Sequence, residues 1–153
     1  MMLATMFCKA QSRHITPEMQ ENVKLYNAKI DELIDRTSKN GFHIVREEKL
    51  HLRNNIDMIV NIQLLEGNWY HFCFVGDPSS TKVKATLFME GIGDLVQDRI
   101  KVKRENEFWT EFSFICPQSG NYEFTVCQKA PVERPLSYLT VFKKDAAGIS
   151  SPK

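Results

Sequence analysis

The sequence lacks an excess of charge of either sign. Its 153 residues include 20 Lys and Arg against 19 Asp and Glu. A nucleic-acid-binding protein normally carries a basic face or stripe, and attraction to anionic lipid requires a polybasic segment. The balance therefore argues against a nucleic-acid partner and against electrostatic attachment to a membrane. The 42% hydrophobic content is that of a globular chain, and the length suffices for one domain with a buried core.

The apolar run at the start of the chain is too short to cross a bilayer. Residues 1–8 are mostly apolar, and small residues, Cys8 and Ala10, stand at the two positions that a signal peptidase reads. We predict that residues 1–10 are a truncated secretory signal peptide and that the protein is periplasmic or secreted. The alternatives are a frayed N-terminus or an additional edge strand.

The common catalytic and metal-binding motifs are also missing. The histidines His14, His43, His51 and His71 form no His-Glu-x-x-His pattern, and no Gly-x-Ser-x-Gly or P-loop pattern occurs. No two cysteines have Cys-x-x-Cys spacing, so neither a structural zinc site nor a redox motif is indicated. We therefore expect no catalytic residues, no metal and no cofactor.

Residues 16–40 have the pattern of an amphipathic helix. Thr16 can cap its N-terminus, Pro17 suits the first helical position, and Asn40-Gly41 tolerates the backbone conformation of a helix end. Apolar residues recur at spacings of three or four and form one stripe, made of Met19, Val23, Tyr26, Ile30, Leu33 and Ile34. We predict that this stripe packs on the rest of the domain. Dimerisation through the stripe is the alternative.

After Gly41 the apolar period changes to two, which is typical of half-buried strands. Segments with this alternation lie at 42–45, 56–64, 70–74, 83–89, 95–102, 108–114, 122–126 and 136–142, with turn residues between them. We interpret 46–55 as a polar turn with a weak edge strand, 101–107 as a charged loop and 145–153 as a flexible tail. The pattern predicts that residues 42–144 form an antiparallel β-sandwich of about eight strands, preceded by the helix.

Three stretches of the β-rich region follow a recognisable order. LLEGNWYHFCFVGD joins a hydrophobic residue and a glycine to an aromatic strand, ATLFMEGIGDLV joins a strand to a glycine turn, and FSFICPQSGNYEFTV joins a Phe-rich strand to a Pro-x-Ser-Gly corner. With these stretches, residues 62–142 resemble the bacterial pre-peptidase C-terminal domain, a secreted β-sandwich of jelly-roll type. The resemblance implies a jelly-roll-like fold and a role in secretion or substrate binding, although residues 1–61 contain no peptidase. Some relatives bind calcium through loop carboxylates, but the only loop candidates, Asp77 and Asp94, form no recognisable cluster.

The corner at 116–121 has a physical explanation. Pro117 ends a strand because it has no N–H to donate, and Gly120 permits a backbone angle that other residues resist. Tyr122 can bury its ring while its hydroxyl bonds to nearby backbone. The segment is either a tight hairpin or a crossing between two sheets, and the resemblance implies the crossing.

The alternation also limits how the cysteines can pair. Cys116 shares the parity of the inward aromatic residues and Cys127 does not, so a disulfide between them would be geometrically poor in a simple hairpin. Cys73 and Cys127 are both out of phase with their inward neighbours and could meet if their strands adjoin. The cysteines are therefore either buried free thiols or include a Cys73–Cys127 disulfide. Cys8 would leave with the signal peptide.

Four side chains are predicted to point away from the core: Trp69, His71, Phe88 and Trp109. Exposed aromatic rings can form a platform for a sugar ring, a polymer or another protein, so these four are the candidate binding residues. The alternative is that the N-terminal helix covers this face and the rings are its packing partners. For His71 we expect a packed or solvated side chain rather than a metal ligand or a base.

These observations predict an exported, non-catalytic β-sandwich module that binds a protein or polysaccharide partner, as a monomer or weak dimer. One alternative is a small hydrolase on a jelly-roll-like scaffold, which requires histidine and carboxylate side chains that converge on a concave face. The other is a cytosolic interaction protein that uses the helix.

Overall fold

The computed structural model describes residues 15–89 and 101–145, and the side chains of the second segment from Arg104 onward. The predicted signal peptide at 1–10, Asp94, residues 146–153 of the predicted tail and most of the predicted strand at 95–102 lie outside these residues. Within the described residues the chain forms one helix and eight strands. No helix of this described part is long and apolar enough to cross a membrane.

The helix, α1, spans Pro17–Lys39 and confirms the predicted N-terminal helix. The Thr16 hydroxyl accepts a hydrogen bond from the Met19 backbone N–H at 3.2 Å, as an N-cap residue does. Beyond the helix end, Gly41 has a φ of +87°, a conformation that favours glycine.

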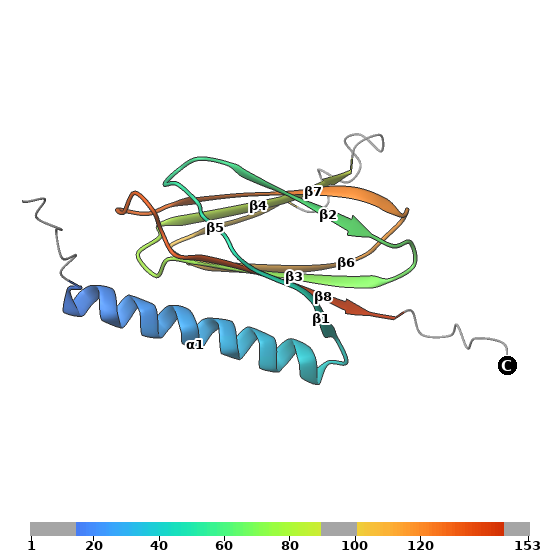
Figure 1. Cartoon of the computed structure of the whole chain (residues 1–153), viewed down its shortest axis with the longest axis horizontal. Helices are drawn as coiled ribbons and strands as arrows, with labels where there is room; N and C mark the ends of the chain where they lie inside the picture. The colour runs from blue at the N-terminus through green and yellow to red at the C-terminus, as the bar shows by residue number, and fades with distance from the viewer. Residues whose placement is uncertain (1–14, 90–100, 146–153) are drawn as a thin grey trace, which may run out of the picture.

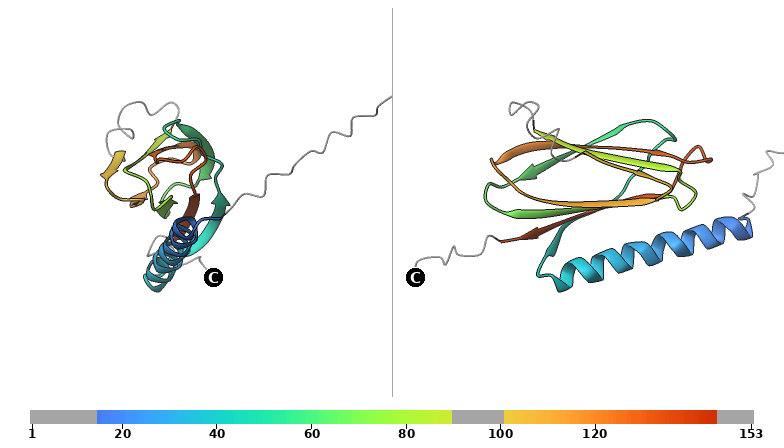
Figure 2. Two further views of the ribbon diagram at one scale, coloured as in Figure 1. Left: turned by 90° about the vertical axis from the view of Figure 1, so that its left-hand side faces the viewer. Right: turned by 180° about the vertical axis from the view of Figure 1, so that it is seen from behind.

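The strands form two antiparallel sheets that lie face to face (Figures 1 and 2). They are β1 (His43–Lys49), β2 (Met58–Leu64), β3 (Trp69–Gly76), β4 (Lys82–Met89), β5 (Lys101–Glu105), β6 (Trp109–Ile115), β7 (Gly120–Lys129) and β8 (Ser137–Lys144). The helix-side sheet has the order β1-β8-β3-β6, with α1 along its outer face, and the second sheet has the order β2-β7-β4-β5. The predicted β-sandwich is confirmed.

The strand order is that of a jelly roll. β1 pairs with β8, β2 with β7, β3 with β6 and β4 with β5, so the chain folds as one long antiparallel ribbon wound into two sheets. Every connection except the one between β4 and β5 passes from one sheet to the other. The turns between successive strands therefore mostly connect the two sheets and do not form hairpins within one sheet.

The core lies between the two sheets and is built from the inward side chains that the period of two predicts. Phe72 stacks on Phe112 and Phe124, with ring centroids 5.0 Å and 5.7 Å apart. Val83 and Leu87 of β4 complete this layer and are fully buried. Burial of each such side chain contributes about 1.5 to 3 kcal/mol, which is why the alternation fixes the register of the strands.

The corner at 116–121 joins β6 of the helix-side sheet to β7 of the second sheet, so it is the predicted crossing. Tyr122 is fully buried, and its hydroxyl donates a hydrogen bond to the Gln118 carbonyl. Cys73, Cys116 and Cys127 are free thiols. Cys73 and Cys127 lie in different sheets, which excludes the disulfide considered between them.

The structure departs from the sequence predictions at two strands of the second sheet. Residues 101–105 form β5 and not a charged loop, because pairing with β4 uses main-chain hydrogen bonds and an edge strand tolerates charged residues. Ile56 is 54% exposed and does not face the core, because β2 begins only at Met58.

Helix α1 packs on the helix-side sheet through part of its apolar stripe. Tyr26 and Leu33 are buried in a second apolar cluster with Val75, Phe142 and neighbouring side chains. The earlier part of the stripe is more open, with Met19 51% exposed and Val23 43% exposed. The N-terminal end of α1 extends past the sheet (Figure 1), and Met19 and Val23 line an open hollow there together with Val132 and Leu136.

Candidate functional site

The four predicted binding residues lie on two different faces of the sandwich. Trp69 and His71 on β3 and Trp109 on β6 are on the outer face of the helix-side sheet. Phe88 is on β4, in the second sheet. The structure therefore does not bring Phe88 together with the other three.

The two tryptophans are held in different ways. Trp69 is 42% exposed, meets the Phe42 ring edge-on at a centroid distance of 5.6 Å, and has the Lys144 ammonium 5.6 Å from its ring centre. Trp109 is half-buried in the apolar cluster under α1, with the Lys29 ammonium 4.8 Å and the Arg104 guanidinium 4.4 Å from its ring. Trp109 is thus a packing partner of the helix, whereas Trp69 keeps much of its ring accessible.

His71 belongs to a polar cluster that lies beneath the last turns of α1. Its Nε2 is 2.9 Å from one Glu111 carboxylate oxygen, and its Nδ1 contacts the Ser113 hydroxyl. Arg36 of α1 donates a hydrogen bond to the other Glu111 oxygen, and the Cys73 sulfur lies 3.9 Å from the first. The cluster ties the helix to the sheet through an ion pair.

The charges of this cluster follow from its contacts. The hydrogen bond from His71, with a smaller contribution from Arg36, lowers the pKa of Glu111 despite its partial burial, so this carboxylate stays ionised. Burial, assisted by the Glu111 charge, raises the pKa of the Cys73 thiol to about 12. The thiol is therefore protonated at neutral pH.

Of this cluster, only His71 was a candidate binding residue from the sequence; Arg36, Glu111 and Ser113 were not predicted, and Cys73 was considered only for a disulfide. They meet because Cys73 faces Glu111 and His71 faces Ser113 across the β3–β6 ladder. The available signal was the pair of alternations, His-x-Cys on one aromatic strand and Glu-x-Ser on another. These alternating residues form a cluster only if the two strands pair with each other in this register.

Ser113, His71 and Glu111 are linked in the order hydroxyl, imidazole, carboxylate that nucleophilic catalysis uses. Ser113 is exposed on the edge strand β6 of its sheet. An acyl-transfer site needs donors directed at the developing oxyanion, and here the Arg36 donor is directed at Glu111. The imidazole and the carboxylate, together with the neighbouring Cys73 thiol, are also a set of potential ligand atoms.

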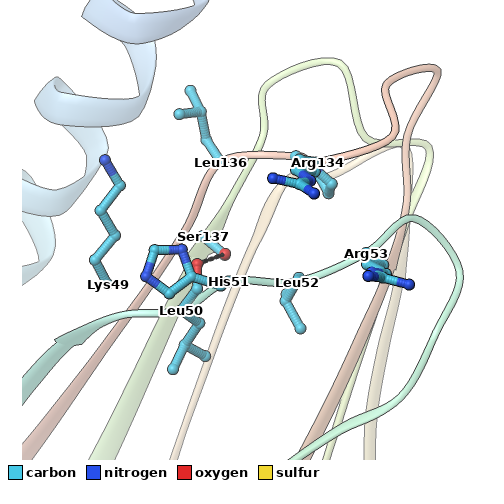
Figure 3. Close-up of a pocket in the computed structure, with 9 residues that line it drawn as sticks. Lys49, Leu50, His51, Leu52, Arg53, Arg134, Leu136 and Ser137 are labelled. Atoms are coloured by element: carbon cyan, nitrogen blue, oxygen red, sulfur yellow. Dashed lines mark hydrogen bonds between the residues drawn. The ribbon is translucent and has the colours of Figure 1, made fainter.

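A basic cavity of about 530 Å³ lies between the β1–β2 and β7–β8 connections, with residues 49–53 on one side and 134–137 on the other (Figure 3). Its volume is within the range of small-ligand sites. The lining residues are Lys49, Leu50, His51, Leu52, Arg53, Arg134, Pro135, Leu136 and Ser137.

Buried hydrogen bonds hold the two walls of this cavity. The Ser137 hydroxyl donates to the Leu50 carbonyl at 2.7 Å and joins one wall to the other (Figure 3). The buried amide of Gln128 donates to the Leu136 carbonyl at 2.9 Å, and the Leu136 N–H donates to an Asp77 carboxylate oxygen at 3.1 Å. Asp77, the loop carboxylate considered for calcium, thus accepts hydrogen bonds within the fold. The cavity is preformed.

The electrostatic character of the cavity comes from three exposed cationic side chains, Lys49, Arg53 and Arg134, with His51 beside them. The side chains of Lys49, Arg53 and Arg134 have no hydrogen-bond or ion-pair partner among the described residues. In a chain whose formal net charge is only +1, this is a local concentration of positive charge. This concentration is not evident in the sequence, because the two walls are about eighty residues apart in the chain and the overall charge is balanced.

No protein-family model matches the chain, and no curated protein sequence is significantly similar to it.

Proposed function

We propose that this protein is a non-catalytic binding module that recognises an acidic polysaccharide at the basic cavity. The observation that carries the proposal is the preformed cavity, surrounded by Lys49, Arg53 and Arg134 without partners among the described residues. Carboxylate or sulfate groups suit these side chains, since a guanidinium binds two oxygens of one such group at once.

The size and lining of the cavity favour a sugar unit over a protein surface. A cavity of about 530 Å³ encloses a small ligand, whereas a protein interface usually buries about 800 Å² on each partner. Leu52 and Leu136 contribute apolar lining between the charges. A pyranose ring that carries a carboxylate has both a C–H face for such a surface and a charged edge for the cations.

Retention on immobilised polymers tests the class of ligand. We would compare a polyuronate, a sulfated glycan, a neutral glucan and polyglutamate at equal loading, with the full-length protein. We expect retention on the two acidic polysaccharides that decreases steeply with added salt, because exposed charges are screened. Equal retention on the neutral glucan, or stronger retention on polyglutamate, would contradict the proposal.

Export is a separate part of the proposal and depends on residues 1–10. A module that binds an acidic polysaccharide would meet its ligand outside the cytoplasm, which agrees with the predicted signal peptide. N-terminal sequencing of protein recovered from the periplasm or the medium tests this. A mature start after Ala10 would support export with cleavage, and an intact Met1 would count against it.

A further inference from the structure

The polar cluster beneath α1 brings three kinds of metal-binding donor to one point. His71 and Cys73 alternate on β3, so both side chains are on the outer face, and Glu111 on β6 is the direct cross-strand partner of Cys73. The imidazole nitrogen, the sulfur and a carboxylate oxygen all lie within 4.8 Å of one another. This convergence results from strand register and needs no sequence motif.

The spacing of the donors is close to that of a tetrahedral zinc site. Typical zinc bond lengths place nitrogen and oxygen ligands about 3.4 Å apart and sulfur and oxygen ligands about 3.6 Å apart. In the structure the His71 Nε2 and the Glu111 oxygen are 2.9 Å apart, and the Cys73 sulfur and that oxygen are 3.9 Å apart. The His71 nitrogen and the Cys73 sulfur lie within 4.8 Å of each other, where two such zinc ligands would be about 3.6 Å apart, so side-chain rotation is needed to bring all three donors to bonding distance of one ion.

The surrounding residues already make the contacts that orient metal ligands. Ser113 contacts His71 at Nδ1 and leaves Nε2 for the metal, an arrangement that fixes the tautomer of a ligating histidine. Arg36 bonds one Glu111 oxygen and the Cys73 sulfur is near the other, so Arg36 orients the carboxylate without occupying the ligand atom. The last turns of α1 cover the site, with Cys73 only 2% exposed and Thr37 only 4% exposed.

We propose that His71 Nε2, Cys73 Sγ and one Glu111 oxygen bind a zinc ion, with the fourth position left for water. Mixed nitrogen, sulfur and carboxylate donors suit Zn²⁺ and not Ca²⁺ or Mg²⁺, which prefer oxygen alone. The thiolate and the carboxylate balance the two charges of the ion, and the thiol proton passes to solvent when the metal binds. This site is separate from the basic cavity and does not depend on the proposed function.

Titration with cobalt tests the site, because Co²⁺ bound to a thiolate gives a charge-transfer absorption that zinc then removes. The full-length protein, reduced and freed of metal, is titrated with Co²⁺ and then with Zn²⁺. We expect one equivalent of cobalt to produce the thiolate band and one equivalent of zinc to abolish it. A wild-type protein that shows no saturable one-to-one binding would overturn the proposal.

Cysteine variants locate the sulfur ligand. Cys73→Ser should lose the thiolate band, whereas Cys127→Ser, the same change on the second sheet, and Cys8→Ser, at the N-terminus, should keep it. Retention of the band in Cys73→Ser, or its loss in either control variant, would overturn the proposal.

A second set of variants covers the case in which Cys73→Ser does not fold. His71→Gln retains donor and acceptor groups toward Ser113 and Glu111 but has no imidazole, and we expect it to bind zinc at least about tenfold more weakly. Ser113→Ala changes only the orienting contact, and we expect its zinc affinity to fall about tenfold. Unchanged zinc affinity in His71→Gln would refute the site.

Discussion

The Tyr122 hydroxyl donates a 2.8 Å hydrogen bond to the Gln118 carbonyl and closes the corner at which the chain crosses between the two sheets. We expect Tyr122→Phe to lower the free energy of unfolding by about 1 to 2 kcal/mol, because the carbonyl loses its hydroxyl donor and keeps only the weaker thiol donor of Cys116 at 3.2 Å. Tyr138→Phe is the matched control, because the Tyr138 hydroxyl bonds an exposed Glu47 carboxylate. We expect this substitution to lower the free energy of unfolding by less than about 0.5 kcal/mol. Urea denaturation measures both, and equal losses would contradict this role of the corner.

The apolar stripe of α1 should contribute unevenly to stability. Leu33 is 1% exposed and Met19 is 51% exposed, although the sequence places both in one stripe. We expect Leu33→Ala to lower the free energy of unfolding by about 2 to 5 kcal/mol, through lost burial and a cavity, and Met19→Ala to change it by less than about 0.5 kcal/mol. Chemical denaturation followed by tryptophan fluorescence measures both changes, because Trp109 packs beneath the helix. A large effect at Met19 would indicate that this end of the helix is also covered, for instance by a second copy of the chain.

Alkaline pH should weaken the docking of α1 through Tyr26. Burial raises the pKa of Tyr26 from its ordinary value near 10 to about 12. Below pH 10 both the folded and the unfolded chain keep the phenol proton, so the contribution of Tyr26 to stability is complete. Between about pH 10 and pH 12 the unfolded chain loses that proton before the folded chain does, so the free energy of unfolding falls as the pH rises.

The comparison with Tyr26→Phe isolates this contribution from the other groups that titrate in the same range. Between pH 9 and pH 11 we expect the free energy of unfolding of the wild type to fall by about 1 kcal/mol more than that of the variant. Urea denaturation at the two pH values provides the measurement. Identical losses in the two proteins would show that the phenol of Tyr26 does not stay protonated in the fold.

The wall of the basic cavity should depend on the buried amide of Gln128. Its carbonyl oxygen accepts from the Asp77 N–H at 3.0 Å and from the Ser80 hydroxyl at 2.7 Å, and its amide donates to the Leu136 carbonyl. We expect Gln128→Leu to lower the free energy of unfolding by about 2 to 4 kcal/mol, since it leaves these buried groups without partners. It should also weaken binding of an acidic polysaccharide at temperatures where the variant is folded.

An exposed glutamine provides the control for this change. Gln63 bonds Asn121 at the surface at 3.3 Å, so Gln63→Leu should leave both stability and binding nearly unchanged. Thermal unfolding and polysaccharide binding are measured on the same preparations. If Gln128→Leu folds less stably but binds as the wild type does, the amide supports the fold and not the shape of the cavity.

Much of the fold follows from local physical chemistry and was therefore predictable from sequence. Thr16, Pro17 and Gly41 mark the helix ends, and the period of two places Phe72 and Phe124 in the core. At the corner 116–121, the resemblance to the pre-peptidase C-terminal domain implied a crossing between the sheets and not a hairpin, and the topology confirms the crossing. Edge strand β5 was not predicted, because main-chain pairing at a sheet edge requires no apolar alternation.

The candidate sites were less predictable because they depend on contacts between distant segments. The outward direction of Trp69 and Phe88 follows from alternation, but only the topology shows that they lie on opposite sides of the sandwich. The meeting of Cys73 with Glu111 requires the register of β3 against β6. The basic cavity requires the loop that contains Arg53 to lie beside the loop that contains Arg134, a consequence of the jelly-roll winding.

Titration calorimetry with an acidic oligosaccharide shows whether the basic cavity is the binding site. Arg53→Gln combined with Arg134→Gln removes two charges at the cavity, and Lys24→Gln combined with Lys129→Gln removes two exposed charges elsewhere. We expect the first pair to raise the dissociation constant at least about tenfold and the second pair to leave it unchanged, because paired charges in a preformed site contribute more than general attraction. Equal dissociation constants for the wild type and the cavity variant would show that the oligosaccharide does not bind at this cavity.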